Sequence, residues 1–198
     1  MYLCGFLSWE ESFMKHSKVR TLCEGAIILA IAFILSYLGF SPVQSGGSID
    51  IAMLPIIFFA FRHGIGWGTG VGFIYGILQY IEGNGLAIDW RTIVAGYLIA
   101  YTLLGLGAGL MKKNNVYLAT LLGGILRFAA HYLAGALVWA EWMPEEFLSL
   151  PMTSPWIYSL LYNGIYMLPC IAIVMLLFTL LVKNRKIKEM LDGKDLTK

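Results

Sequence analysis

The sequence predicts an all-α membrane protein: a bundle of six transmembrane helices with both termini in the cytoplasm. Hydrophobic residues make up 59% of the 198 residues and charged residues only 13%, which is too apolar for a soluble domain. The apolar residues form six separate segments, most of them near the length of about 20 residues that a spanning helix needs. Lysine and arginine gather on alternate connections between these segments, the pattern expected when basic loops stay in the cytoplasm.

The six predicted helices cover, approximately, residues 22–39, 51–61, 65–81, 92–111, 116–140 and 156–182. Four or five of them are long enough to cross a bilayer, whereas the second is too short to cross unaided. We therefore expect the second helix to be sheltered by its neighbours or to end at a cavity. Glycines crowd the start of the third segment and the end of the fourth, and such small residues usually let membrane helices approach closely.

The chain is divided into a cytoplasmic or interfacial N-terminal segment (1–20), a six-helix membrane domain that binds substrate (21–183) and a basic cytoplasmic tail (184–198). Trp9, Glu10 and Glu11 interrupt the first apolar run and no basic residues precede it, so no cleaved signal peptide is expected. The N-terminal segment is interpreted either as a short surface helix or as a poorly ordered end. The external loop 141–155 contains three prolines, which exclude a continuous helix.

Polar residues within the last two apolar segments predict a buried binding site. Arg127 and His131 are four residues apart and so share a helix face, which Gly135 and Trp139 continue. Such groups are rarely kept in a membrane without a partner, a water-filled cavity or a ligand. Asn163 follows in the sixth segment. Two simpler explanations stay open, a structural role for the histidine and an aromatic belt for the tyrosines at the external boundary.

Other classes of function are excluded by what the sequence lacks. It has no HExxH and no Walker motif, and its three cysteines are scattered without CxxC spacing. His16 and His63 are placed on the cytoplasmic side, away from His131, so no metal site is expected. We therefore expect neither an enzyme nor a bound cofactor. Nucleic-acid binding is also excluded, because the basic residues sit at segment ends instead of forming one face.

One group of motifs, in this order, resembles a known family. The motifs are Gly46-Gly47-Ser48, Met53-Leu54-Pro55, Tyr75-Gly76-Ile77-Leu78-Gln79, Leu104-Gly105-Leu106-Gly107, Arg127-x-x-x-His131, Trp139 and Tyr158-Ser159-Leu160-x-Tyr162-Asn163-Gly164. Together they resemble the thiamin-specific substrate-binding (S) components of energy-coupling factor (ECF) transporters, the ThiT or YuaJ family. The resemblance covers about residues 18–183.

The resemblance implies a six-helix S component in the cell membrane that binds thiamin near the external face, beneath the loop joining the first two helices. It also implies a membrane coupling subunit and two ATPase subunits as partners, with toppling of the S component to release the vitamin inside. Small residues on the first helix meet the coupling subunit in this family, and Ala26 and Ala30 match that pattern. From the residues alone they show only a close-packing face, whose partner is equally another helix of this chain.

By motif, His131, Trp139, Tyr158 and Asn163 correspond to positions that contact the ligand in the family. An indole or imidazole face would hold the thiazolium cation by stacking and cation-π attraction, while Tyr158 and Asn163 would satisfy the polar groups of the vitamin. Arg127 lies deeper, and we expect it to be a structural donor to backbone carbonyls or a helix end.

The sequence departs from the family where an acid followed by tyrosine is usual, because it has Gly96-Tyr97 there. Leu86 also replaces a loop tyrosine. Glu82 or Asp89 is expected to substitute for the acid, and Glu82 is preferred because it ends the third helix on the pocket side. Otherwise the ligand is not thiamin itself but another small heteroaromatic nutrient such as a thiamin precursor. A non-transporting membrane scaffold is the alternative from a different class.

Overall fold

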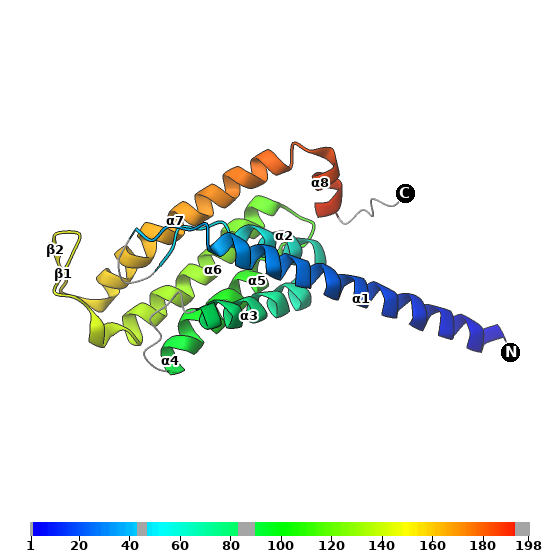
Figure 1. The fold of residues 1–198 in the computed structure, drawn as a ribbon, viewed down its shortest axis with the longest axis horizontal. Coiled ribbons are helices and arrows are strands. Elements are labelled where there is room, and N and C mark those ends of the chain that lie inside the picture. The colour runs from blue at the N-terminus through cyan, green and yellow to red at the C-terminus, as the bar shows by residue number, and fades with distance from the viewer. Residues whose placement is uncertain (1, 43–46, 83–89, 193–198) are drawn as a thin grey trace.

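The computed structural model describes the backbone of residues 2–42, 47–82 and 90–192, and the side chains of these ranges from residue 18 onward. The described chain is helical except for its connections and one short hairpin (Figure 1). Its main helices are α1 (Tyr2–Ser36), α2 (Met53–His63), α3 (Ile65–Glu82), α5 (Ala100–Leu110), α6 (Val116–Leu137) and α7 (Pro155–Leu181). The short ones are α4 (Trp90–Ile93), the π-helix η1 (Val94–Ile99), the 3-10 helix η2 (Ala140–Trp142) and α8 (Arg185–Leu191).

Each of the six predicted apolar segments contains a helix, and α4, η1 and α5 follow one another without a gap as one helical segment. Within the described residues, four segments are long and apolar enough to cross a membrane: Lys18–Ser36, Trp90–Leu110, Val116–Leu137 and Pro155–Leu181. These findings confirm a helical protein of membrane type. Six crossings and cytoplasmic termini stay predictions. α1 includes the predicted N-terminal segment in one continuous helix.

The short second helix is sheltered, as predicted. α2 has 11 residues and contacts α1, α3, α5, α6, α7 and α8. Its side chains Met53, Ile56, Ile57 and Phe59 have no exposed surface. A helix too short to span a bilayer is thus packed among other helices, which bury seven of its eleven residues.

The glycines of α3 and α5 allow the closest helix packing in the bundle. A Cβ atom on Gly72 would collide with the backbone of Tyr101, and one on Gly105 would collide with the backbone of Gly68. By contrast, Gly66 and Gly70 have open space around their Cα atoms. The predicted role of the glycines in close packing therefore holds for some positions of α3 and not for others.

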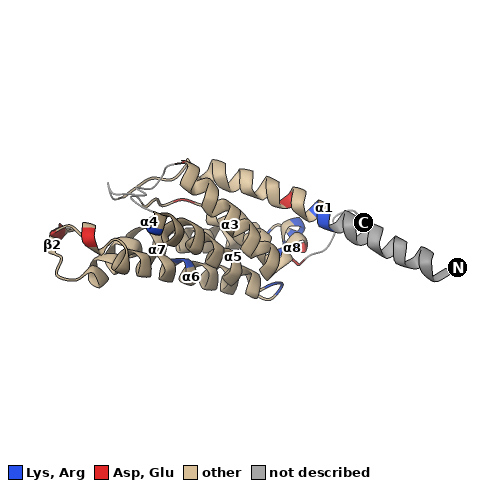
Figure 2. Cartoon of the chain, turned by 90° about the horizontal axis from the view of Figure 1, so that it is seen from below, with Lys and Arg blue, Asp and Glu red and all other residues tan. Residues whose placement is uncertain are grey.

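Charged residues are most frequent at the two ends of the bundle, and their balance differs between the ends. In Figure 2 the basic residues around α8 and the start of the described part of α1 lie at one end, and acidic residues near β2 lie at the other. This is the charge asymmetry that the sequence predicts. The loop of residues 141–155 is not a continuous helix, as expected: it holds η2 and an antiparallel hairpin of β1 (Glu146–Phe147) and β2 (Leu150–Pro151).

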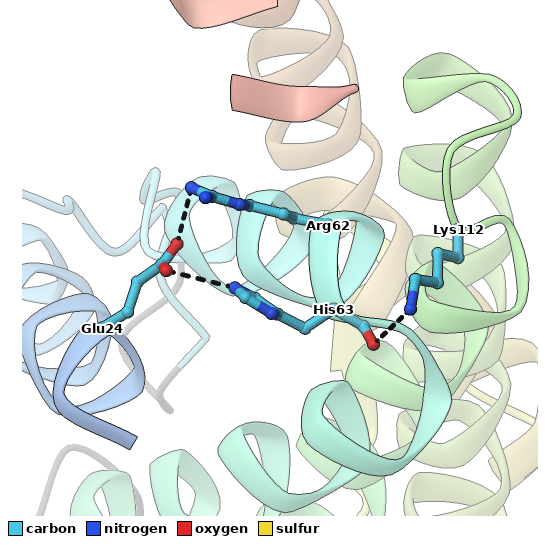
Figure 3. A network of polar contacts seen from close by, with 4 residues as sticks. All are labelled: Glu24, Arg62, His63 and Lys112. Carbon is cyan, nitrogen blue, oxygen red and sulfur yellow. Dashed lines mark hydrogen bonds and ion pairs between the residues drawn. The ribbon is translucent and has the colours of Figure 1, made fainter. Parts of the chain in front are cut away.

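A polar cluster at the basic end fastens α1 to the end of α2 (Figure 3). Arg62 Nη1 donates to Glu24 Oε1 at 3.0 Å, and His63 Nε2 lies 3.2 Å from Glu24 Oε2 without hydrogen-bond geometry. Lys112, which follows α5, donates to the backbone oxygen of His63 at 3.0 Å. The cluster therefore joins three parts of the chain on the side of the bundle opposite the hairpin.

Candidate ligand-binding site

A cavity of about 430 Å³ lies between α6, α7 and the helical segment that contains η1. This volume is within the usual range for small-molecule sites. The cavity is lined by Gly47, Ser48, Gln79, Thr92, Gly96, Tyr97, Tyr101, Arg127, His131, Ala134, Gly135, Trp139, Trp142, Pro144, Tyr158, Ser159, Tyr162, Asn163 and Tyr166. It is therefore built from α3, α4, η1, α5, α6 and α7, from the turn after α6 and from the segment before α2.

The segment between α1 and α2 is folded so that Gly47 and Ser48 reach the cavity. Ser48 Oγ donates to Asp50 Oδ2 at 2.8 Å, and the backbone N–H of Ala52 donates to Asp50 Oδ1 at 2.9 Å. Gly47 has a φ of 73°, and a Cβ atom there would lie 2.7 Å from the ring of Tyr166. Only glycine combines this backbone conformation with so close an approach.

Five of the six side chains predicted for the site line this cavity. The stripe on α6 faces it, with Arg127, His131 and Gly135 on the wall and Trp139 just beyond the helix end. Tyr97, Tyr158 and Asn163 are the other predicted residues on the wall. The i, i+4 spacing along α6 was enough to find this face.

Glu82 differs from its expected place. It is absent from the cavity wall and instead accepts hydrogen bonds from Gln79 Nε2 at 2.8 Å and from Ser36 Oγ at 3.1 Å. The position of Glu82 at the end of α3 was predicted correctly, but its side chain turns to α1. Gly46, Leu86 and Asp89 lie outside the described residues.

Arg127 also differs from its expected role. Its Nη2 donates to the hydroxyl of Tyr101 at 2.9 Å, whereas we expected backbone carbonyls or a helix end as its acceptors. Arg127 is 4% exposed. It carries the only fixed charge among the described lining residues. A buried guanidinium thus forms part of the wall of the site.

Two wall residues each have a buried nitrogen atom without a hydrogen-bond partner in the described structure: Arg127 Nε and His131 Nε2. Both are buried, and an unsatisfied buried polar group costs about 1–3 kcal/mol. A ligand or water with matching polar atoms would remove that cost. Arg127 and His131 are therefore the wall residues with unused hydrogen-bonding capacity.

Asn163 is already held by its neighbours. Its Nδ2 donates to the backbone oxygen of Ser159 at 2.8 Å, and its Oδ1 accepts from the hydroxyl of Tyr166 at 2.6 Å. Ser159 Oγ in turn donates to the backbone oxygen of Tyr132 on α6 at 2.7 Å. The carboxamide is thus fixed in one orientation at the contact between α6 and α7.

Aromatic rings make up much of the remaining wall. The ring centroids of Tyr158 and Tyr162 are 5.6 Å apart, and those of Tyr162 and Tyr166 are 5.8 Å apart. Trp139 lies 5.7 Å from Trp142 in an edge-to-face arrangement. Rings of this kind attract a flat or cationic ligand through their faces.

The wall opens at Gly96, the position where the sequence lacks the acid of the ThiT or YuaJ pattern. Gly96 lies in the π-helix η1, and a Cβ atom there would meet nothing within 4 Å. Gly96 and Tyr97 belong to this π turn and line the cavity. π turns are often found at functional sites. The described lining residues include no carboxylate.

Gln79 and Tyr101 are wall residues that were not predicted from the sequence. Gln79 was seen only as part of a family motif, although a buried carboxamide in an apolar helix was itself a signal. Tyr101 gave no such signal, because its role depends on contact with Arg127, 26 residues away in the sequence.

Comparison with known proteins identifies the family. The model of the family described as thiamine transporter protein (Thia_YuaJ) matches residues 22–189. The thiamine transporter ThiT of Bacillus subtilis is 32% identical over 186 residues, which covers 83% of this chain and 94% of that protein. The chain belongs to the Thia_YuaJ family.

Two further relatives agree with this membership. The thiamine transporter ThiT of Lacticaseibacillus paracasei is 27% identical over 167 residues, covering 76% of this chain and 80% of that protein. The solved structure of ThiT from Listeria monocytogenes superposes with a TM-score of 0.74 at 22% identity, covering 86% of this chain and 98% of that one. This structural likeness shows a shared fold.

Membership of the Thia_YuaJ family confirms several predictions. The chain is a multi-pass membrane protein of a transporter family and not an enzyme. The family itself is the one that the motifs indicated.

Proposed function

We propose that the chain is the S component of an ECF-type importer, which binds thiamin at the external side of the membrane and delivers it for ATP-driven uptake. The observation that carries the proposal is the cavity, because Tyr97, His131, Trp139, Tyr158 and Asn163 all line it in a chain of the Thia_YuaJ family. Its B. subtilis and L. paracasei relatives are both described as thiamine transporters.

The chemistry of the wall suits the two halves of thiamin. The thiazolium ring is a permanent cation, and an aromatic face attracts such a cation by about 0.5–2 kcal/mol. Trp139 and the tyrosines of α7 offer these faces. Arg127 repels a cation, so the neutral aminopyrimidine is the half that we place near its unpartnered Nε and near His131 Nε2.

One observation favours a second ligand. The described wall has a fixed positive charge at Arg127 and no carboxylate, and Gly96 stands where the motif resemblance implies an acid. A neutral heteroaromatic nutrient, such as the aminopyrimidine precursor of thiamin, avoids the repulsion that a thiazolium meets. Membership of a transporter family argues against the non-transporting scaffold considered from the sequence.

We further propose that the outer face of α1 docks on a membrane coupling subunit, which works with two ATPase subunits. Ala26 and Ala30 are exposed on α1, together with the large apolar residues Leu22, Ile27 and Ile34. Both alanines therefore face away from the other described helices. Small exposed residues of this kind let another membrane helix approach closely.

Two experiments test these proposals. Titration of the purified chain with thiamin, its aminopyrimidine precursor and its thiazole precursor is expected to quench tryptophan fluorescence through Trp139 without ATP. A response to none of the three would refute the binding function. Purification of the tagged chain from its native membrane is expected to recover a coupling subunit and two ATPases, and recovery of the chain alone would refute the assembly.

A further inference from the structure

Glu82 does not line the cavity, but it accepts a hydrogen bond from Gln79, which does. We propose that Glu82 is a positioning residue, which fixes the guanidinium of Arg127 through a directed chain of hydrogen bonds across Gln79 and Tyr101. The role in ligand binding rests on the function proposed above. The chain of hydrogen bonds itself is read from the geometry and joins α3, α5 and α6.

The carboxylate of Glu82 sets the orientation of the Gln79 amide. Gln79 Nε2 lies 2.8 Å from Glu82 Oε2. An ionised carboxylate only accepts hydrogen bonds, so the NH₂ group of the amide must face Glu82. The amide oxygen of Gln79 then faces the other way, where it lies 3.4 Å from the hydroxyl of Tyr101. Gln79 is 5% exposed, so bulk water does not compete for these bonds.

At the other end of the chain of hydrogen bonds, the guanidinium of Arg127 determines which atom donates. A guanidinium has donors only, so the hydroxyl oxygen of Tyr101 must accept the bond from Arg127 Nη2 at 2.9 Å. The single hydroxyl proton of Tyr101 is then left to point to the amide oxygen of Gln79. Every donor therefore points the same way, from Arg127 through Tyr101 and Gln79 to Glu82.

The two charged ends make this direction the favoured one. A chain of hydrogen bonds in a buried, weakly polar environment is strengthened when its bonds polarise one another. Here the positive end lies on the cavity wall and the negative end lies on α3 next to α1. With Nη2 of Arg127 held by Tyr101, the guanidinium of this wall residue, including its unpartnered Nε, is kept in place. Glu82 thus positions a charged residue of the cavity wall without lining the cavity itself.

Ser36 supplies a control, because it contacts the same carboxylate from outside the chain of bonds. Ser36 Oγ lies 3.1 Å from Glu82 Oε2 and 2.6 Å from the backbone oxygen of Phe33, and its single proton serves one of these acceptors at a time. Removal of the Ser36 hydroxyl leaves the hydrogen bond between Gln79 Nε2 and Glu82 Oε2 in place. We therefore expect Ser36→Ala to keep ligand affinity close to that of the wild type.

The test compares thiamin dissociation constants of full-length variants by fluorescence titration. Glu82→Gln removes the charge, so its amide no longer dictates which face of the Gln79 amide turns towards it. We expect about a 10-fold loss of affinity, the size of one hydrogen bond. In a Tyr101→Phe background, where the chain is already broken, the same substitution is expected to change affinity less than about 2-fold. A purely structural role would give the same loss in both backgrounds.

A second variant keeps the test informative if Glu82→Gln folds poorly. Glu82→Asp keeps the carboxylate and draws it back by one methylene group, and we expect a smaller loss of affinity than with glutamine. Wild-type protein that binds no thiamin would overturn the proposed function and this role with it. If the wild-type protein binds thiamin, either of two results would overturn the role of Glu82 alone. One is an unchanged affinity in the Glu82 variants, and the other is a loss that simply adds to the loss caused by Tyr101→Phe.

Discussion

Arg127 and Tyr101 contact each other in two ways. Arg127 Nη2 donates to the Tyr101 hydroxyl at 2.9 Å, and the guanidinium carbon lies 4.4 Å from the centroid of the Tyr101 ring. The tyrosine therefore provides both a hydrogen-bond acceptor and an aromatic face for the same cation. This pairing explains how α6 accommodates a buried arginine, and it leaves Nε of Arg127 without a hydrogen-bond partner.

Tyr101→Phe is expected to lower the stability of the unliganded protein. The substitution keeps the ring but removes the acceptor of a buried charged donor, a loss of about 1–3 kcal/mol. Thermal unfolding in detergent measures the change. Tyr117→Phe is the matched control, because Tyr117 is 37% exposed and lies outside the cavity wall. Equal midpoints for the two variants would show that Tyr101 does not support Arg127.

Trp139→Ala is expected to weaken thiamin binding about 5- to 30-fold and to remove most of the fluorescence quenching. The reason is the loss of an aromatic face next to the cation, worth about 1–2 kcal/mol. His131→Ala is expected to weaken binding as well. Trp90→Phe serves as the control, since Trp90 is 72% exposed and is not on the wall. Quenching that is lost with Trp90 and kept with Trp139 would place the ligand elsewhere.

Gly96→Glu is expected to raise thiamin affinity, because the open space at Gly96 admits a carboxylate next to a cationic ligand. A charged hydrogen bond in a buried site contributes about 1.5–3 kcal/mol, so a gain of about 10-fold or more is expected. Gly96→Gln adds the same shape without the charge and is expected to give a smaller gain. Equal affinities for the two variants would argue against a missing carboxylate at this position.

Gly72→Ala and Gly70→Ala form a matched pair within α3. The first places a methyl group against the backbone of Tyr101, and such overpacking costs about 1–3 kcal/mol. The second places it in open space, where alanine favours the helix by about 0.5–1 kcal/mol. Thermal midpoints are therefore expected to move in opposite directions. A loss of similar size in both would mean that α3 and α5 do not pack as described.

Glu24→Gln is expected to destabilise the contact between α1 and α2. Arg62 and His63 have side chains 11% and 17% exposed, and the loss of the charged acceptor costs Arg62 about 1.5–3 kcal/mol. Glu189→Gln is the control, because its partner Arg185 is 90% exposed and such a pair contributes about 0–1 kcal/mol. If both variants unfold at the same temperature, the cluster does not fasten α1.

The part of the site that lies on a single helix could be predicted from the sequence. The stripe of Arg127, His131 and Trp139 was found because side chains four residues apart share a face of α6. The sheltered position of α2 followed in the same way from its length. A property of one element was enough in each case, residue spacing for α6 and length for α2.

The rest depended on contacts between helices far apart in the sequence. The rotation of Glu82 towards Ser36 is set by the packing of α1 on α3, and spacing along α3 does not reveal it. The acceptor of Arg127 is Tyr101 on another helix. The π turn at Val94–Ile99 has no local sequence signature that we recognised, although it carries the open position at Gly96.

The most direct test of the account is a calorimetric titration of the purified wild-type chain with thiamin, repeated with the variant His131→Ala. We expect one thiamin per chain without ATP, with clearly weaker binding by the variant. Absence of heat and of any bound thiamin in the wild type, or equal affinity in the variant, would contradict the claim that the cavity between α6 and α7 is a thiamin site.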